Sequence, residues 1–206
     1  MLTHHSGRVL LQAGDLVPGP PPVHAEHADA LRTILDWARQ YLTKPHRDLG
    51  RSGPVCPFVS ASLRNARFHL AVCPGADLDR ADVVKTVRAY RNWFGELSIR
   101  DTPKAQFTTI LILFPELPAG RIAELIDGIQ AELKLEFVHD GLMLGQFHPL
   151  PPSAPGLWNP DFRPLHSPVP MLVIRHMVAS DLPFLTEDPD HAAAYDAIFG
   201  ARAANA

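Results

Sequence analysis

Apolar residues recur at helical spacing in several stretches of the chain. The first predicts a helix over about residues 25–42, which should end before Pro45 because the residue before a proline disfavours helical geometry. A second helix follows Asp79, which with Asp82 three residues later approximates a helix-capping box. A third covers about residues 119–133, and a short amphipathic helix is expected near the C-terminus.

Four other stretches have the pattern of strands. Residues 67–72 alternate between apolar and other side chains, whereas residues 107–114 (FTTILILF) end continuously apolar, as in a central strand buried on both faces. Residues 142–147 and 171–178 are two further strands. Because strand, helix, strand and helix follow one another, the pattern predicts at least one right-handed crossover. We therefore expect an α/β (or α+β) fold with a four- to five-stranded mixed sheet covered by helices.

The length of 206 residues favours one domain. We place this single α/β domain at residues 25–200, between an N-terminal tail of residues 1–24 and a C-terminal tail of residues 201–206. The N-terminal tail contains the sequence VPGPPPV, which is typical of a polyproline arm.

Proline is about twice as frequent as in an average protein, with 21 residues. Eight of them lie between Pro149 and Pro170, and residues 45–57 are also rich in proline and glycine. Both stretches predict long irregular loops. Such loops are uncommon inside a compact domain unless they serve a function, and proline keeps them rigid. The two loops are therefore candidate pocket walls.

Composition and missing motifs exclude several classes of function. The net charge of −3 comes without a basic stripe, so we expect no nucleic-acid partner. The longest apolar run, Ile110–Phe114, is too short to cross a membrane, and the two cysteines are too few for a disulfide framework, which favours a reducing, cytoplasmic location. Glycine-rich nucleotide loops and the HExxH, GxSxG and CxxC motifs are missing, which argues against Rossmann hydride transfer, phosphoryl transfer and common hydrolases. A haem enzyme is consistent with this set, because one axial side chain can hold a cofactor that carries the reactivity.

The two loops and the last strand contain the candidates for chemistry. The first loop contains His46, Arg51 and Cys56, and the second contains His148, Asn159, Asp161, Arg163 and His166. In the last strand, alternation places His176 on one face and Arg175 on the other. Each loop precedes a predicted strand, so if these strands are neighbours the loops meet at one site.

Several motifs in these loops carry a family resemblance: GRSGPVCPFVSASL at residues 50–63, and GQFHP, NPDFRPL and SPVPMLVIRHM within residues 141–185. Over about residues 37–185 the chain resembles an uncharacterised bacterial family associated with specialised-metabolite gene clusters. More distantly, the proline–cysteine loop followed by a strand, a helix and further strands is similar to the YqcI/YcgG family. Members of that family include haem-dependent enzymes that oxygenate nitrogen on small amino-acid-derived substrates.

This resemblance implies a haem-dependent oxidoreductase, a monooxygenase that acts on a small nitrogen-containing substrate. His46 is the first choice of iron ligand because it lies in the loop that leads to the resembling motif, and His148 or the Cys56 thiolate are the alternatives. Arg51, Arg163 and Arg175 would pair with haem propionates or a substrate carboxylate, where bidentate geometry matters. Asn159, His166 and His176 would contact the substrate.

Two other functions are consistent with the same residues. The protein could be a non-catalytic small-molecule carrier or a partner protein of a biosynthetic pathway, with the proline loops as its docking surface. It could instead be a non-haem iron enzyme, since His148, His166 and His176 with Asp161 supply the histidines and carboxylate that suit iron(II). The sequence is also compatible with a homodimer.

Overall fold

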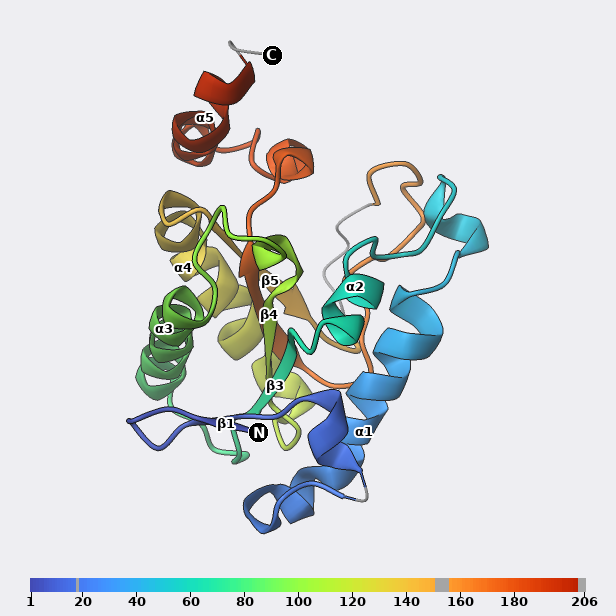
Figure 1. The fold of residues 1–206 in the computed structure, drawn as a ribbon, viewed down its shortest axis with the longest axis vertical. Coiled ribbons are helices and arrows are strands. Elements are labelled where there is room, and N and C mark those ends of the chain that lie inside the picture. The colour runs from blue at the N-terminus through green and yellow to red at the C-terminus, as the bar shows by residue number, and fades with distance from the viewer. Residues whose placement is uncertain (18, 151–155, 204–206) are drawn as a thin grey trace.

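The sheet has four strands in the spatial order β3–β4–β6–β5 (Figure 1). They run over Phe68–Val72 (β3), Thr109–Leu113 (β4), Leu142–Phe147 (β5) and Met171–His176 (β6). β3 and β4 are parallel, while β6 is antiparallel to both of its neighbours, β4 and β5. The computed structural model describes residues 1–17, 19–150 and 156–203. These residues form a single α/β domain with a mixed sheet, as the sequence predicts.

Helices cover both faces of this sheet. α3 (Arg80–Leu97) and α4 (Gly128–His139) pack on one face, and α1 (Ala28–Trp37) and α2 (Val59–Arg64) pack on the other (Figure 1). Asp79 caps α3, because its carboxylate accepts hydrogen bonds from two backbone N–H groups of the first turn. Since α3 connects the parallel strands β3 and β4, it forms the predicted crossover.

α1 and α4 each adjoin a π-helical turn. Residues Ala38–Leu42 continue α1, and residues Ala123–Asp127 lead into α4 after a short 3₁₀ turn at Ala119–Arg121. The helix expected at 119–133 therefore extends further, to His139. π-Helical turns frequently occur at functional sites, so the side chains of these two turns are candidate functional residues.

The central strand β4 is buried on both faces, as its continuous apolar sequence predicts. Ile110 and Ile112 belong to the core on the α3 and α4 side, whereas Leu111 and Leu113 belong to the core on the α1 side. All four side chains are at most 3% exposed.

The two faces of β5 and β6 are covered unequally. On the α3 and α4 side, all the alternating residues except Gln146 are buried: Leu142, Leu144, Leu172, Ile174 and His176. On the α1 side, most of the alternating residues are only half-buried: Met143, Gly145, Phe147, Val173 and Arg175. α1 covers β3 and β4 but leaves this part of the sheet partly open.

The N-terminal residues pack against the domain, which differs from the expected tail at residues 1–24. β1 (Leu2–Thr3) and β2 (Val9–Leu10) form a small antiparallel hairpin, which precedes a 3₁₀ turn at Ala13–Leu16. Leu11 exchanges two backbone hydrogen bonds of 2.8 Å with Leu70 at the edge strand β3. Leu10 and Leu11 are fully buried, because the hairpin supplies apolar side chains to both cores. A further 3₁₀ segment, Pro22–His27, leads into α1.

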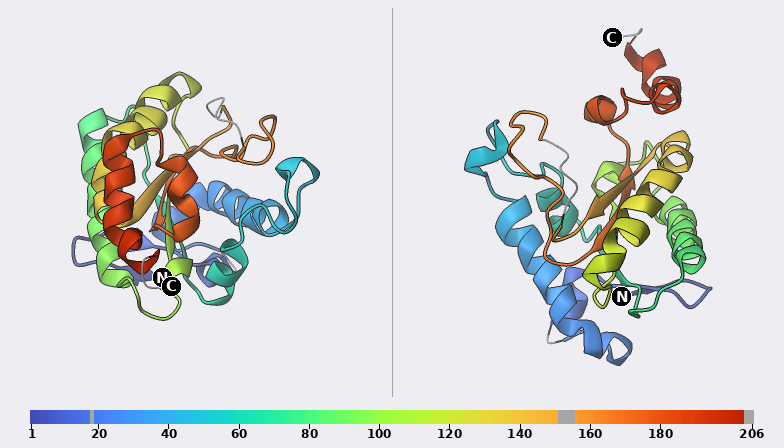
Figure 2. Two further views of the ribbon diagram at one scale, coloured as in Figure 1. Left: turned by 90° about the horizontal axis from the view of Figure 1, so that it is seen from above. Right: turned by 180° about the vertical axis from the view of Figure 1, so that it is seen from behind.

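The C-terminal part lies at the end of the sheet where β6 ends (Figure 2). A 3₁₀ segment, Ala179–Phe184, follows β6 and precedes α5 (Pro189–Ala203). Tyr195 of α5 packs with Val138 of α4 in a small third core. The predicted C-terminal helix is thus present, and residues 204–206 of the expected C-terminal tail lie outside the described residues.

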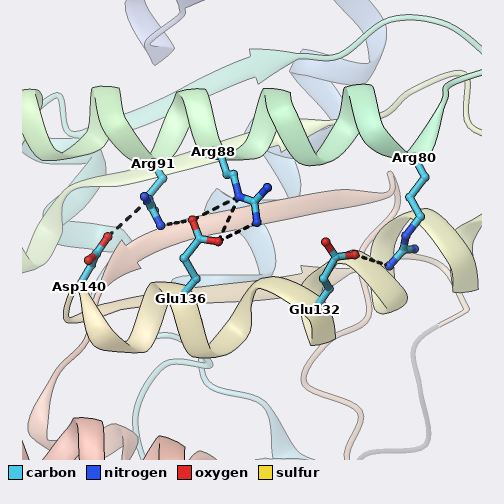
Figure 3. A network of polar contacts seen from close by, with 6 residues as sticks. All are labelled: Arg80, Arg88, Arg91, Glu132, Glu136 and Asp140. Carbon is cyan, nitrogen blue, oxygen red and sulfur yellow. Dashed lines mark hydrogen bonds and ion pairs between the residues drawn. The ribbon is translucent and has the colours of Figure 1, made fainter.

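Ion pairs bridge the exposed sides of α3 and α4 (Figure 3). Arg80 pairs with Glu132, Arg88 and Arg91 pair with Glu136, and Arg91 also pairs with Asp140 just after α4. Such half-exposed pairs contribute only about 0–1 kcal/mol each, so the buried apolar contacts between these helices dominate their packing.

Candidate functional site

The two proline-bounded loops lie side by side and touch through residues 48–51 of the first loop and residues 158–159 of the second. The side-chain amide of Asn159 donates a hydrogen bond of 2.7 Å to the carbonyl of Asp48. The guanidinium of Arg51 lies 4.9 Å from the ring centre of Trp158. Ala or any larger residue at Gly50 would place its Cβ 2.7 Å from the Trp158 carbonyl oxygen, so the backbones are in close contact. We call these three contacts the loop clasp.

The loops meet for a different reason from the one the sequence suggested. β3 and β6 are not neighbours, because β4 lies between them, and α2 separates the first loop from β3. The described residues that precede β6 instead lie on the α1 side of the sheet, beside the loop that follows α1 (Figure 1). The expected convergence of the two loops is therefore confirmed, but the proposed pairing of their strands is wrong.

One arginine in each loop donates hydrogen bonds to carbonyls of its own loop. Arg51 donates to the carbonyls of Ser52 and Val55 at 2.9 and 3.2 Å. Arg163 donates to the carbonyl of Pro160 at 2.6 Å. These hydrogen bonds connect each guanidinium to the backbone of its own turn.

A half-buried apolar surface lies at the edge of the α1-side core. Its members come from α1 and its π-helical turn, the first loop, α2, β5 and β6, and each packs against the buried core while remaining partly exposed: Trp37, Tyr41, Val55, Cys56, Leu63, Phe147 and Val173. We call these seven residues the apolar patch. Two of its members, Phe147 and Val173, lie on the part of the sheet that α1 leaves partly open.

Aromatic rings connect the apolar patch to the clasp. Phe147 lies 6.2 Å from Trp37, and Trp37 lies 6.0 Å from Tyr41, measured between ring centres. The row continues from Tyr41 to His46 at 5.7 Å and from His46 to Phe162 at 5.3 Å. Burial raises the pKa of Tyr41, so its phenol is neutral at physiological pH.

His46 and Cys56 are the two candidate iron ligands close to the apolar patch. Nδ1 of His46 accepts a hydrogen bond of 3.2 Å from the backbone N–H of Asp48, so in this arrangement the proton resides on Nε2. A carboxylate oxygen of Asp48 lies 3.9 Å from the same Nδ1, too far for a hydrogen bond, so a metal at Nε2 would require the His46 ring to give up its hydrogen bond from the Asp48 N–H. Cys56 belongs to the patch itself, and its backbone N–H donates to the Leu42 carbonyl at 2.9 Å.

His148 lies on the opposite side of the sheet from the patch. It is 1% exposed, and its Nε2 lies 2.9 Å from a carboxylate oxygen of Asp127, in the π-helical turn before α4. Among the residues that the structure describes, its Nδ1 has no hydrogen-bond partner. His166 forms a backbone bridge with His148, but its side chain is exposed. Asp161 is exposed, and its backbone N–H donates to the Asn159 side chain.

Arg175 and His176 lie at the far end of β6. Arg175 makes two hydrogen bonds of 2.7 Å to the carboxylate of Asp181, which is 3% exposed. Nε2 of His176 contacts the hydroxyl and carbonyl of Ser98 at 2.9 and 3.0 Å. Burial, together with the charge of Arg100, lowers the pKa of His176 to about 4, so this ring is neutral at physiological pH.

The expected non-haem iron site is not assembled. His176 pairs with the first residue of β5, whereas His148 follows the last, which places them roughly 20 Å apart at about 3.4 Å per residue. In the part of the chain that the structure describes, no three His, Cys, Asp or Glu side chains lie close enough to hold a metal ion together. The prediction of a shared site for His148, His166, His176 and Asp161 is therefore wrong.

Sequence reasoning missed the aromatic members of the patch. Trp37 and Tyr41 lie four residues apart on one helix, a spacing that places them on one face, and Phe147 ends a strand. These signals were visible, but nothing in the sequence indicated that this face would remain partly exposed.

Fold and site together define a single-domain α/β protein with a half-covered sheet and an aromatic surface beside two rigid loops. Residues 31–206 match the family described as Domain of unknown function (DUF6875), and the chain belongs to that family. No curated protein and no solved structure matches the chain significantly. Over the described residues, helices that combine the length and apolarity required to span a bilayer are not found.

Proposed function

We propose that this protein is a haem-dependent enzyme that acts oxidatively on a small nitrogen-containing, amino-acid-derived substrate. The observation that carries the proposal is the apolar patch, a partly exposed set of aromatic and aliphatic side chains that includes a cysteine and continues through an aromatic row to a histidine. A porphyrin is a large flat apolar ring, and apolar and aromatic side chains form most of the lining of cofactor sites. The resemblance of the loop containing Cys56 to the YqcI/YcgG family supports the same cofactor.

The side chains at the patch that could bind iron, Cys56 and His46, suit haem better than a metal ion without a porphyrin. One axial ligand is sufficient for haem, and the patch offers Cys56 directly and His46 at its border. His148 and His176 do not fit as ligands there, because both side chains lie on the other side of the sheet. When bound, the haem would supply the activation of dioxygen or peroxide.

The residues of the protein would bind the haem and orient it. Trp37, Tyr41 and Phe147 would hold the ring, while the neutral phenol of Tyr41 could donate a hydrogen bond. The clasp would keep the second loop beside the first, so that Arg51 stays close to the patch. Such prior ordering reduces the entropy lost when a ligand binds.

Titration of the purified full-length chain with hemin tests this proposal by visible absorption. We expect a shifted Soret band that saturates at roughly one hemin per chain. Cys56→Ala or His46→Ala should change the band or weaken binding at least tenfold. The matched controls are Cys73→Ala, whose thiol is held protonated because burial raises its pKa to about 11, and His139→Ala, an exposed histidine on α4. Both controls should bind as the wild type does.

A further variant tests where on the protein hemin binds. Val173→Trp adds bulk on the partly open sheet face and should obstruct binding without disturbing the buried face of β6. Hemin uptake that is unaffected by Val173→Trp and by both ligand variants would overturn the proposal. The alternative outcome is that the chain binds hemin saturably but oxidises no amino-acid-derived amine, whether supplied with peroxide or with a reductant and dioxygen. That result would show a haem carrier and not an enzyme.

A further inference from the structure

Two surface segments each expose a pair of large apolar side chains. Of the eight such side chains that are exposed in the described part of the chain, four fall in these two segments. Single exposed apolar residues are normal on a protein surface, whereas groups of them rimmed by polar residues mark interaction sites. The four are Leu157 and Trp158 in the second loop, and Leu182 and Phe184 in the 3₁₀ segment after β6.

The first of these segments is basic. We define the clasp surface as residues 44–51 and 156–163, the two stretches that the loop clasp holds together. It contains four cationic side chains and two carboxylates, a net charge of +2, although the whole chain has a net charge of −3. Two of the cations, Arg51 and Arg163, donate to neutral carbonyls, which leave their charges uncompensated.

The second segment is acidic. We define the cap surface as residues 182–190, which contain three carboxylates and neither Lys nor Arg, a net charge of −3. Lys134 of α4 donates to the Phe184 carbonyl at 3.0 Å and offsets one of these charges. The cap surface therefore remains negative and is opposite in sign to the clasp surface. Its carboxylates are Glu187, Asp188 and Asp190.

The protein holds both surfaces in place. The loop clasp joins the two stretches of the clasp surface. The cap surface is anchored by Leu185, which is buried in the small third core. It directly follows Asp181, whose carboxylate accepts two hydrogen bonds of 2.7 Å from Arg175. Surfaces that are ordered beforehand lose less conformational entropy when they associate.

The two surfaces project at the same end of the molecule. The clasp surface lies on the α1 side, and the cap surface lies where β6 ends (Figure 1 and the right view of Figure 2). A twofold axis between them would bring the clasp surface of one chain against the cap surface of a second chain, and the same contact would form again in reverse. A contact that closes in this way gives a dimer and not a filament.

From the opposite charges, the exposed apolar pairs and their placement, we propose that two copies of this chain form a dimer in which the clasp surface of each copy binds the cap surface of the other. Trp158 would be the main apolar anchor, because tryptophan is among the residues that contribute most to interface energies. The charges around it would set the orientation of the two chains. This dimer does not depend on haem binding at the apolar patch, so each proposal can fail without the other.

Sedimentation equilibrium of the full-length chain without hemin tests the dimer. We expect a mass that rises with concentration from 22.7 kDa to twice that value and no further. Because salt screens exposed charges, raising NaCl from about 0.05 to 0.5 M should weaken the dimer. Trp158→Ala should weaken it about tenfold, whereas Val17→Ala, at another exposed apolar position, should not.

Charge reversal tests the pairing of the two surfaces. Lys44→Glu in the clasp surface and Glu187→Lys in the cap surface should each weaken the dimer about fivefold or more, because like charges then face each other. The chain that carries both changes should recover most of the wild-type affinity, which a merely misfolded variant would not do. Lys85→Glu and Asp77→Lys, reversals at exposed positions outside both surfaces, should leave the affinity unchanged.

Four results would overturn the proposal. The first is a chain that stays monomeric at every concentration, and the second is a mass that continues to rise beyond the dimer. The third is a dimer that neither Trp158→Ala nor salt weakens. The fourth is a pair of charge reversals that behave as their controls do or that do not restore affinity when combined.

Discussion

Gly50→Ala should open the loop clasp, and its effect can be separated from the general cost of replacing a glycine. Gly50 has φ of +79°, where an L-residue costs about 1–2 kcal/mol. The added Cβ would also lie 2.7 Å from the carbonyl oxygen and 2.8 Å from the carbonyl carbon of Trp158. Because backbone atoms cannot move as a flexible side chain can, the second loop must shift away from the first.

Gly53→Ala is the matched control. Gly53 lies in the same loop with φ of +90°, but the nearest atom to its added Cβ is Arg51 Nη1 at 3.6 Å, an ordinary contact. Both variants carry the left-handed cost, and both gain about 0.4–1 kcal/mol from a less flexible unfolded chain. Their difference therefore reports the clasp itself.

Gly50→Ala should disrupt two contacts, the hydrogen bond from Asn159 to Asp48 and the Arg51–Trp158 interaction. An intramolecular hydrogen bond contributes about 0.5–1.5 kcal/mol and an exposed cation–π contact about 0.5–1 kcal/mol. We expect Gly50→Ala to unfold in urea with about 1–2.5 kcal/mol less stability than Gly53→Ala. Hydrogen exchange should also accelerate at residues 156–166 in Gly50→Ala alone. Equal stabilities and equal exchange in the two variants would refute the clasp.

Three other predictions concern the core and the buried charges. Leu11→Ala should cost about 2–5 kcal/mol in urea unfolding because Leu11 is fully buried, whereas Val17→Ala, at an exposed position, should be nearly neutral; a small loss at Leu11 would restore the tail interpretation. Asp181→Asn should destabilise by about 1–3 kcal/mol, less than a fully buried pair because the Arg175 side chain is 30% exposed; retention of the wild-type urea midpoint would contradict this. The pKa of His176 is about 4 in the folded chain and about 6.5 in the unfolded chain, so the unfolded chain binds the proton more readily and stability is lost as the pH falls from about 6.5 to 4. His176→Gln should flatten this pH dependence of the urea midpoint. An unchanged slope would show that the ring is not kept neutral.

Residue patterns along the chain predicted α1, α3, α4 and α5, the four strands of the main sheet and the class of fold, but not α2 or the β1–β2 hairpin. The continuous apolar run at 107–114 predicts a strand buried on both faces, and β4 is such a strand. The alternation in 171–178 separates Arg175 from His176, and the two side chains do find different partners, Asp181 and Ser98. These features are local, because each depends on the repeat of one helix or strand and on the burial of its apolar side.

The candidate site depended on contacts between distant segments. His46, Arg51 and Asn159 lie in loops that the sequence marks as unusual, yet their partners are backbone carbonyls and N–H groups that no side-chain pattern reveals. The partly open face of β5 and β6 is also invisible in the sequence, since it exists only because α1 packs over β3 and β4.

The local sequence therefore determined which segments are helices, strands and rigid loops, since propensity, proline placement and apolar spacing act over a few residues. Only the tertiary structure decided that the hairpin around Leu11 joins the sheet edge, that His148 and His176 lie at opposite ends of β5, and that Trp37 and Phe147 face the same surface. These outcomes follow from strand order and from the helix layer that covers each strand, which depend on burial summed over the whole chain.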